Sequence, residues 1–193
     1  MKQLIITAHP SSKGFTHKIA KTFKKASEAN KNEVEIMNLY HKKYAQDFLA
    51  FEEMSDLGAE NKVRDRIQSK MSEADEYIFV FPIWWGSMPA IMKNFFDVNF
   101  SSGFAFKFHS GGKVDKLLTG KTAKVFATCD APGFIYKLFP FAMRLKGYLS
   151  MYILGFCGIK ITDFQIFDTM GKSRDDTNKR EQMLKKIKNI AQK

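Results

Sequence analysis

Short apolar runs alternate along this chain with longer segments in which apolar residues recur every three or four positions. A run of about four to eight apolar residues has the length of a buried strand, whereas the longer pattern is typical of a helix with one buried face. Five segments fit strands: residues 4–8, 34–39, 77–81, 124–128 and 159–167.

Helical segments follow the predicted strands. They are residues 15–29, 60–71, 89–98, 134–156 and 175–191. We expect the fourth of them to be interrupted near Pro140 and Gly147, and residues 40–59 and 99–120 to be irregular. Parallel strands joined by crossover helices form a sheet that is covered on both faces. The pattern therefore predicts an α/β fold in a single domain, residues 1–193.

The composition agrees with a globular protein. Hydrophobic residues occupy 45% of the 193 positions, which is enough for a full core. No apolar run reaches the length of a transmembrane helix, and the first residues lead into a strand rather than a signal peptide. We therefore expect a soluble, cytoplasmic protein. Because Cys129, Cys157 and the four scattered histidines lack metal-site spacing, no metal is expected.

The net charge of +11 narrows the choice of partners only slightly. Much of it lies in residues 13–25 and 179–193, where helical spacing favours a solvated lysine face. No helix-turn-helix, zinc-finger or RNA-binding motif accompanies the charge, so nucleic acid is not an expected partner. A basic field attracts anions, and phosphorylated cofactors are anions.

The chemistry is expected where strands end, because ligands of open α/β sheets bind beyond the carboxyl ends of the strands. The first such loop combines hydroxyl groups, a lysine and a glycine just before a helix. Free N–H groups at a helix start suit a phosphate, although an ordinary helix cap explains the same residues. The candidate cofactor-binding residues of this loop are His9, Ser11, Lys13, Gly14, Phe15 and Thr16.

Both tryptophans of the chain lie in a second loop, residues 81–89. Pro82 lacks the N–H that a strand ladder needs, and Gly86 interrupts the element, so the strand should end here. Core packing of Trp84 and Trp85 is the alternative. Two consecutive side chains point to opposite faces of a strand, however, so at least one ring is expected to face a crevice and a flat ligand.

The third loop, residues 128–136, contains Thr128, Cys129, Asp130, Ala131 and Tyr136. A buried strand end explains Cys129 equally well, and an ordinary helical position explains Tyr136. Taken together, the three loops offer a phosphate site, a ring edge and a ring face. That is the arrangement by which a flavodoxin-like sheet holds a flavin.

Three segments resemble the flavodoxin-like NAD(P)H:quinone oxidoreductase family, which includes bacterial NADPH:quinone reductases and ancillary subunits of potassium-efflux systems. They are residues 4–16, 81–93 and 155–158, and the second is similar to the family signature Pro-x-x-Trp followed by Pro-Ala-x-x-Lys. The resemblance covers nearly the whole chain. It implies a flavodoxin-like three-layer sandwich whose five-stranded parallel sheet has the order 2-1-3-4-5.

The resemblance also implies which residues contact the flavin and the substrate. The first loop holds the phosphates and the ribityl chain. The isoalloxazine ring is lined by Pro82, Ile83, Trp84, Trp85 and Gly86. The third loop covers the pyrimidine end of the ring, where the Tyr136 hydroxyl is the expected catalytic group because it stabilises negative charge on the reduced flavin. The substrate slot is formed by Trp85, Phe106, Phe108 and Phe156, and family dimers contribute the Phe106 segment.

Several positions depart from the family pattern. Some members have tyrosines at Phe106 and Phe108, Gly-Gly at residues 130–131, and a histidine within residues 137–142. A basic residue that holds the adenylate end of FAD in some members falls near Asn178 of this chain, although Lys179 and Arg180 are adjacent. The family slightly favours FAD and Asn178 favours FMN, so this choice stays open, as does that between NADH and NADPH.

The expected activity is two-electron hydride transfer from NAD(P)H through the flavin to a quinone or similar acceptor, by a ping-pong mechanism in a homodimer. An ancillary flavin-binding subunit of a membrane transport system, such as potassium efflux, is the alternative. Peripheral association with a membrane stays open. Nucleic-acid binding through the basic helices is the least favoured interpretation.

Overall fold

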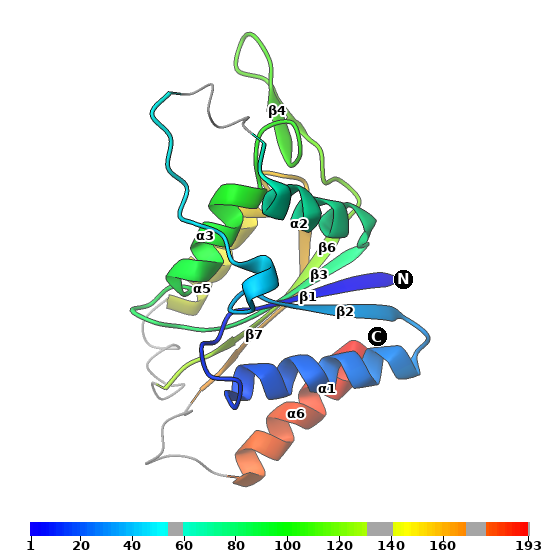
Figure 1. Cartoon of the computed structure of the whole chain (residues 1–193). Coiled ribbons are helices and arrows are strands. Elements are labelled where there is room, and N and C mark those ends of the chain that lie inside the picture. The colour runs from blue at the N-terminus through cyan, green and yellow to red at the C-terminus, as the bar shows by residue number, and fades with distance from the viewer. Residues whose placement is uncertain (54–59, 131–140, 169–176, 193) are drawn as a thin grey trace.

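A five-stranded parallel sheet forms the centre of the molecule (Figure 1). The computed structural model describes residues 1–53, 60–130, 141–168 and 177–192. Across the sheet the strands lie in the order β2-β1-β3-β6-β7. Their bounds are β1 (Lys2–Thr7), β2 (Glu33–Asn38), β3 (Glu76–Pro82), β6 (Thr122–Thr128) and β7 (Lys160–Phe167).

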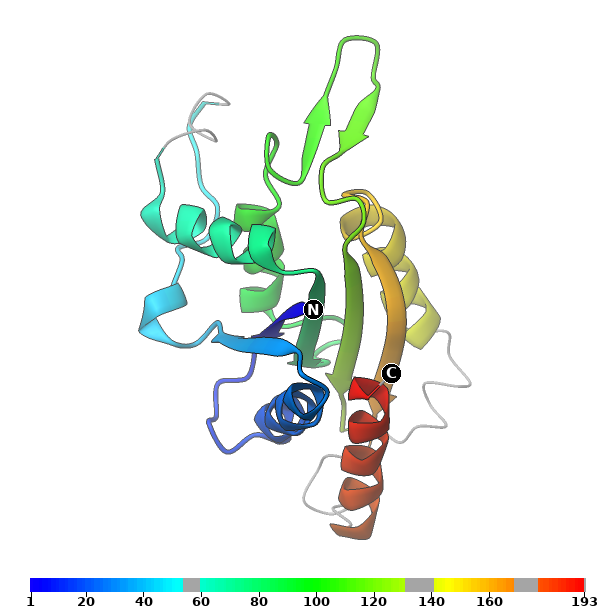
Figure 2. The same ribbon diagram turned by 90° about the vertical axis from the view of Figure 1, so that its right-hand side faces the viewer.

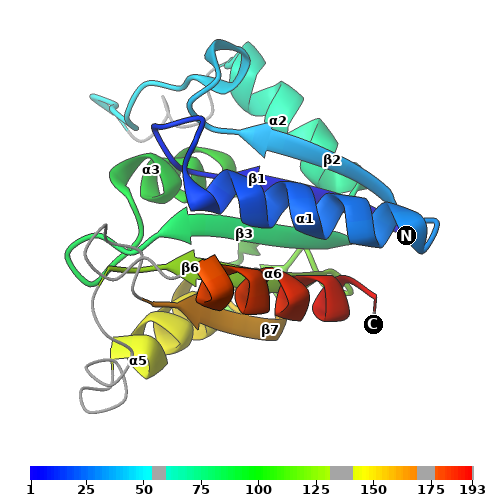
Figure 3. The same ribbon diagram turned by 90° about the horizontal axis from the view of Figure 1, so that it is seen from below.

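Helices cover both faces of this sheet. One face carries α2 (Lys62–Glu73), α3 (Ala90–Asn99) and α5 (Phe141–Tyr148), and the other carries α1 (Phe15–Ala29) and α6 (Thr177–Ala191), as Figure 3 shows. Side-chain alternation along the strands explains the two layers. Ile5 and Ile78 pack with α1 and α6, whereas their neighbours Ile6 and Phe79 pack toward the other helices. Full burial of such a side chain contributes about 2 kcal/mol.

The strand order predicted from the sequence is confirmed. β6 and β7 are the fourth and fifth strands of the sheet in chain order, so the observed arrangement is 2-1-3-4-5. Helix boundaries shift by a few residues. The predicted helix 60–71, for example, begins at Lys62 because the Asn61 side chain caps it, accepting a hydrogen bond from the Arg64 N–H at 2.9 Å.

Two connections differ from the expectation of irregular structure. A single 3₁₀ turn, η1 (Lys42–Tyr44), follows β2. More notably, β4 (Phe106–Phe108) and β5 (Val114–Lys116) form an antiparallel hairpin that projects beyond the amino ends of β6 and β7 (Figure 2). The sequence pattern misses the hairpin because three-residue strands are too short to show alternation, and Gly111 and Gly112 at its tip suggest only a loop.

The helix predicted over residues 134–156 is only partly described, and the break expected near Pro140 lies outside the described residues. The interruption expected near Gly147 is found just after it, because α5 ends at Tyr148. The helix there widens into a π-helical segment, η3 (Leu149–Ile153). Gly155 then passes so close to the Ser150 carbonyl oxygen that a Cβ would lie 1.9 Å from it, which explains the glycine.

Candidate functional site

The three predicted loops begin side by side at one edge of the sheet. The neighbouring strands β1, β3 and β6 end in register, with Thr7 opposite Val80 and Pro82 opposite Thr128. The Ile83 N–H donates to the Thr128 carbonyl oxygen at 2.6 Å and ties the second loop to the third. The strands therefore bring together segments that lie far apart in the sequence.

Two side-chain contacts join the first loop to the other two. In the first turn of α1, the Thr16 hydroxyl oxygen lies 3.5 Å from the Thr128 hydroxyl oxygen. On the other side, the centroids of the His9 and Trp84 rings are 6.5 Å apart. Residues from all three loops thus meet at the carboxyl edge of the sheet, although their roles toward a ligand stay predictions.

The first loop folds around the imidazole of His9. The His9 Nδ1 accepts a hydrogen bond from the Ser11 N–H at 3.1 Å, and the Ser11 hydroxyl accepts one from the Lys13 N–H at 3.3 Å. Gly14 packs so closely on the ring that a Cβ would lie 2.4 Å from Nδ1. Because its φ of −59° is open to any residue, close approach rather than backbone conformation requires glycine here.

The start of α1 presents backbone donors next to this loop. Its N-cap is Gly14, so no side chain caps the first turn, and the positive end of the helix favours an anion. Lys13 is exposed beside it. Phe15 and Thr16, in contrast, are buried side chains, and the Arg180 guanidinium lies 5.0 Å from the Phe15 ring centroid. These two residues therefore have mainly backbone groups to offer to a ligand.

Sequence reasoning missed His17, which contacts the same loop from within α1. The His17 Nε2–H donates to the His9 carbonyl oxygen at 3.2 Å, and the two rings meet edge-on. Burial lowers the pKa of His17 below its ordinary value, and the charges of His9 and Lys21 act in the same direction against the raising effect of that hydrogen bond. The neutral imidazole is therefore favoured.

Residues 84–87 form a tight turn that exposes one indole ring. The Trp84 N–H donates to the Ser87 carbonyl at 2.9 Å, and the Ser87 N–H donates back to the Trp84 carbonyl at 3.0 Å. Trp85 and Gly86 have φ values of 51° and 76°, which makes this a type I′ turn. Trp85 is completely exposed and Trp84 is 42% exposed, so core packing explains neither ring. A left-handed conformation costs a residue such as Trp85 about 1–2 kcal/mol.

The strand ends around this turn present mainly backbone groups. In the third loop Asp130 is exposed, while Ala131 and the predicted catalytic residue Tyr136 lie outside the described residues. The other predicted cofactor-binding residues at these strand ends are buried: Pro82, Ile83, Thr128 and Cys129.

The four predicted substrate residues lie at two opposite ends of the molecule. The Phe106 ring centroid is 5.2 Å from those of Phe108 and Phe156, and this cluster lies with the hairpin at the amino ends of β6 and β7. Trp85 follows the carboxyl end of β3, at the other edge of the sheet (Figure 1 and Figure 2). One chain therefore does not bring Trp85 together with the three phenylalanines.

An exposed apolar surface adjoins this phenylalanine cluster, and sequence reasoning missed it. In η3, Met151 is 65% exposed and Tyr152 is 69% exposed. Phe106, Phe156 and Tyr152 line a hollow of about 280 Å³ there. Helix periodicity alone did not reveal this surface, because the π-helical turn changes which residues face outward.

The segment 155–158 anchors the hairpin and contains a buried thiol. The Leu118 N–H donates to the Cys157 carbonyl at 3.0 Å, and Gly158 turns the chain with a φ of 95°. Burial raises the pKa of the Cys157 thiol to about 11, against a smaller opposing effect of Lys116, so this thiol stays protonated at neutral pH.

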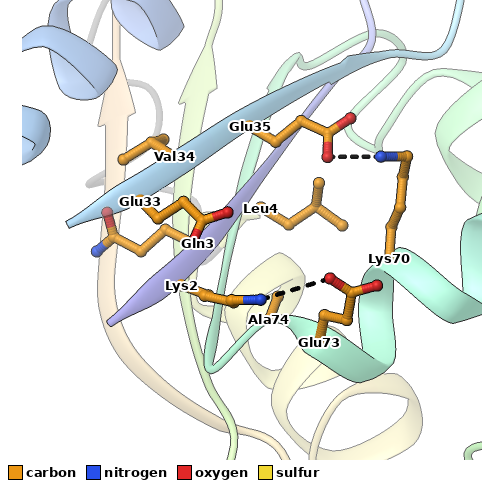
Figure 4. Close-up of a pocket in the computed structure, with 9 residues that line it drawn as sticks. All are labelled: Lys2, Gln3, Leu4, Glu33, Val34, Glu35, Lys70, Glu73 and Ala74. Atoms are coloured by element: carbon orange, nitrogen blue, oxygen red, sulfur yellow. Dashed lines mark hydrogen bonds and ion pairs between the residues drawn. The ribbon is translucent and has the colours of Figure 1, made fainter.

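A second hollow, at the amino edge of the sheet between β1, β2 and α2, does not fit a flavin (Figure 4). Its volume of about 110 Å³ is too small, and Lys70 and Glu35 close across one side at 2.6 Å. Lys2 and Glu73 pair at 3.5 Å on the other side. Within the described ranges, no group of three or more His, Cys, Asp or Glu residues is arranged to hold a metal ion, and no helix is long and apolar enough to cross a bilayer.

Comparison with known proteins identifies the family. The model of a family described as having a flavodoxin-like fold matches residues 1–191. The chain belongs to this family. The match extends over every strand and helix of the sandwich, so the family resemblance predicted from the sequence is confirmed.

Individual relatives agree with this assignment. A Haemophilus influenzae protein named "Uncharacterized NAD(P)H oxidoreductase" is 32% identical over 86% of this chain and 83% of its own length. An "FMN-dependent NADH:quinone oxidoreductase" of Clostridium beijerinckii is 33% identical over 79% of this chain and 77% of its own. Among solved structures, Smu.1420 of Streptococcus mutans is 27% identical, with a TM-score of 0.81 over 100% of this chain and 99% of that one.

Proposed function

We propose that this chain is a flavin-dependent NAD(P)H:quinone oxidoreductase that transfers two electrons from a reduced nicotinamide to a quinone-like acceptor. The observation that carries the proposal is the meeting of an uncapped helix start and a completely exposed indole at one edge of the sheet. The names of the two curated relatives agree with the activity expected from the sequence.

The described residues fit FMN, a flavin with a single phosphate. The uncapped start of α1 and the exposed Lys13 suit that phosphate. The ring contact between His9 and Trp84 connects this site to the turn formed by residues 84–87, which we call the tryptophan turn. FMN is favoured over FAD because the Clostridium relative is named FMN-dependent and, more weakly, because a basic residue of some FAD-binding members falls near Asn178, beside Lys179 and Arg180. The same name favours NADH as the donor.

Each part of the site has a separate task in this proposal. A flavin held here would supply the two-electron redox chemistry between the nicotinamide and the acceptor. Trp85 offers an apolar face on which flat rings stack. The buried strand end at Thr128 and Cys129 keeps water from that edge, and Tyr136 keeps its predicted role as a donor to developing negative charge.

A second copy of the chain completes the substrate slot. Because Trp85 and the phenylalanine cluster lie at opposite ends of one chain, we assign Phe106, Phe108 and Phe156 to the site of the other protomer in a homodimer. The exposed Met151 and Tyr152 beside the cluster supply apolar area for such an interface. A cytoplasmic location is part of the same proposal.

The test is the identity of the flavin, followed by turnover. The purified protein is expected to be yellow, to release FMN on denaturation, and to reduce menadione faster with NADH than with NADPH. A protein that binds neither FMN nor FAD would contradict the proposal. Release of FAD would overturn only the assignment of FMN, and faster turnover with NADPH only that of the donor.

A further inference from the structure

Most of the net charge of the chain lies on the two helices that cover one face of the sheet. Together α1 and α6 contain nine lysines or arginines and two glutamates, a formal charge of +7 out of the +11 of the whole chain. The two helices lie side by side, and among the described elements none covers their outer surface (Figure 3). We call this surface the α1–α6 face.

A groove of about 490 Å³ runs along the α1–α6 face between the two helices. Within the described part of the chain, the lysines that line it form no ion pair, whereas Lys24 pairs with Glu28 at 2.9 Å and Lys179 with Asp168 at 2.8 Å. The groove therefore offers uncompensated positive charge over small apolar side chains. The lining residues that matter here are Lys18, Lys21, Lys25, Lys188, Ala26 and Ala29.

We propose that the α1–α6 face binds the surface of an anionic phospholipid membrane. Lysine ammonium groups are attracted by anionic headgroups, and their methylene stems lie against the apolar floor of the groove while the charges reach outward. No large hydrophobic side chain of the described α1 and α6 residues is exposed. The protein therefore adsorbs through charge and does not insert, which makes the interaction reversible and sensitive to salt.

The same observations disfavour a nucleic acid as the occupant. Single strands are held by stacking on aromatic or arginine side chains, and the residues that line the groove include neither. A duplex is read by a helix that enters its major groove, whereas α1 and α6 lie flat against the sheet and against each other. Lysines on a face without stacking side chains suit the plane of a bilayer better.

Binding to a membrane through the α1–α6 face is compatible with the proposed dimer. The hairpin and α5 lie on the side of the molecule away from the α1–α6 face (Figure 1), so both surfaces are available at once. Both helices also begin at the carboxyl edge of the sheet, where the candidate site lies. The adsorbed molecule thus holds that site at the rim of the bound face.

The test is co-sedimentation of the full-length protein with vesicles of phosphatidylcholine alone or with about 30% phosphatidylglycerol, whose anionic headgroups give the membrane a negative surface potential. We expect binding only to the anionic vesicles and its loss in high salt. The double variant Lys21→Glu/Lys25→Glu should bind about 30-fold more weakly or worse. The control Lys62→Glu/Lys160→Glu makes the same charge change at exposed lysines outside the face and should bind like the wild type.

Three results would overturn the proposal: no binding to anionic vesicles, equal loss in the two double variants, or tighter binding to a DNA duplex than to the vesicles. Circular dichroism confirms that both variants fold. Sedimentation does not depend on turnover. A protein that does not bind vesicles can therefore still be an oxidoreductase, and a protein without oxidoreductase activity can still bind vesicles.

Discussion

At the scale of single residues, Gly14 shapes the candidate site by what it lacks. It brings no cap to α1, and it leaves room for the His9 ring, which in turn contacts Trp84. Because Gly14 has no side chain, the N–H groups at the start of α1 stay uncapped and the His9 ring has room to contact Trp84. Three residues further along, His17 adds a half-buried imidazole whose neutral form is favoured in the folded chain.

Gly14→Ala should weaken flavin binding while leaving the fold intact. The new Cβ would lie 2.4 Å from the His9 Nδ1, so the ring must rotate and lose its hydrogen bond with the Ser11 N–H. Loss of this hydrogen bond, and with it of the loop conformation, should raise the dissociation constant for FMN about tenfold. Fluorescence titration with FMN measures the change.

Gly147→Ala is the matched control for this substitution. A Cβ there meets no atom within 4 Å, and alanine suits the interior of a helix better than glycine does. We expect unchanged FMN affinity and equal or slightly higher stability. Equal FMN affinity in both variants would show that the contact between Gly14 and His9 does not shape the site.

The pH dependence of stability should reveal His17. Its pKa is lowered in the folded state, so below the ordinary value of 6.5 the unfolded chain binds protons that folded His17 does not. The stability present at neutral pH is therefore lost as the pH falls from 6.5 through the folded-state pKa. Melting temperatures between about pH 5 and 8 should fall less steeply on the acid side for His17→Gln than for the wild type. Parallel curves would contradict this role.

At the scale of elements, the tryptophan turn exposes the Trp85 ring and holds Trp85 in a backbone conformation that lowers the stability of the fold. Two backbone hydrogen bonds hold Trp85 in a left-handed conformation that a bulky side chain rarely adopts. Strain of this kind persists where the surrounding structure enforces it and often marks a functional site. The turn also explains why both rings stand clear of the core.

Trp85→Asn should raise stability and lower activity. Asparagine tolerates the left-handed conformation, so the free energy of unfolding should increase by about 1 kcal/mol. Loss of the stacking face should reduce kcat/KM for quinone reduction about tenfold. Urea unfolding and steady-state kinetics measure the two effects.

Lys31→Asn separates the effects of strain and stacking. Lys31 has a φ of 62° and is exposed in the turn after α1, far along the helix from the candidate site. It should gain similar stability with unchanged kinetics. If Trp85→Asn also left the kinetics unchanged, the indole would have no part in turnover.

Elements visible from local periodicity were predictable, and contacts between distant elements were not. The five sheet strands and their order followed from buried runs such as residues 77–81 and from the family signature at residues 81–93. The fit of Gly14 against His9 and the left-handed Trp85 depend on backbone geometry that periodicity does not encode. The separation of Trp85 from Phe106 depends on where the hairpin folds.

At the scale of the whole molecule, the homodimer that we propose divides the site between two chains. The carboxyl edge of the sheet carries the loops, and the hairpin at the amino edge carries the phenylalanine cluster. In the proposed two-fold dimer, the carboxyl edge of each protomer would meet the phenylalanine cluster of the other, and symmetry would make the two sites equal. The α1–α6 face stays outside this arrangement.

Two variants that are each defective should restore activity when mixed. Trp85→Ala damages one half of the site and the double variant Phe106→Ala/Phe156→Ala damages the other. Random pairing after joint refolding gives hybrid dimers with one intact site, so turnover should recover to about a quarter of the wild-type value. A mixture no more active than the mean of the separate variants would show that both halves act within one chain.

The division of the site between the two ends of the sheet also affects how activity depends on the amount of protein made. At chain concentrations far below the dimer dissociation constant, doubling synthesis raises the number of complete sites about fourfold. Above it, sites increase only in proportion to the chain. If basal expression stays below that constant, the proposed dimer predicts little quinone reduction before induction and a disproportionate gain after it.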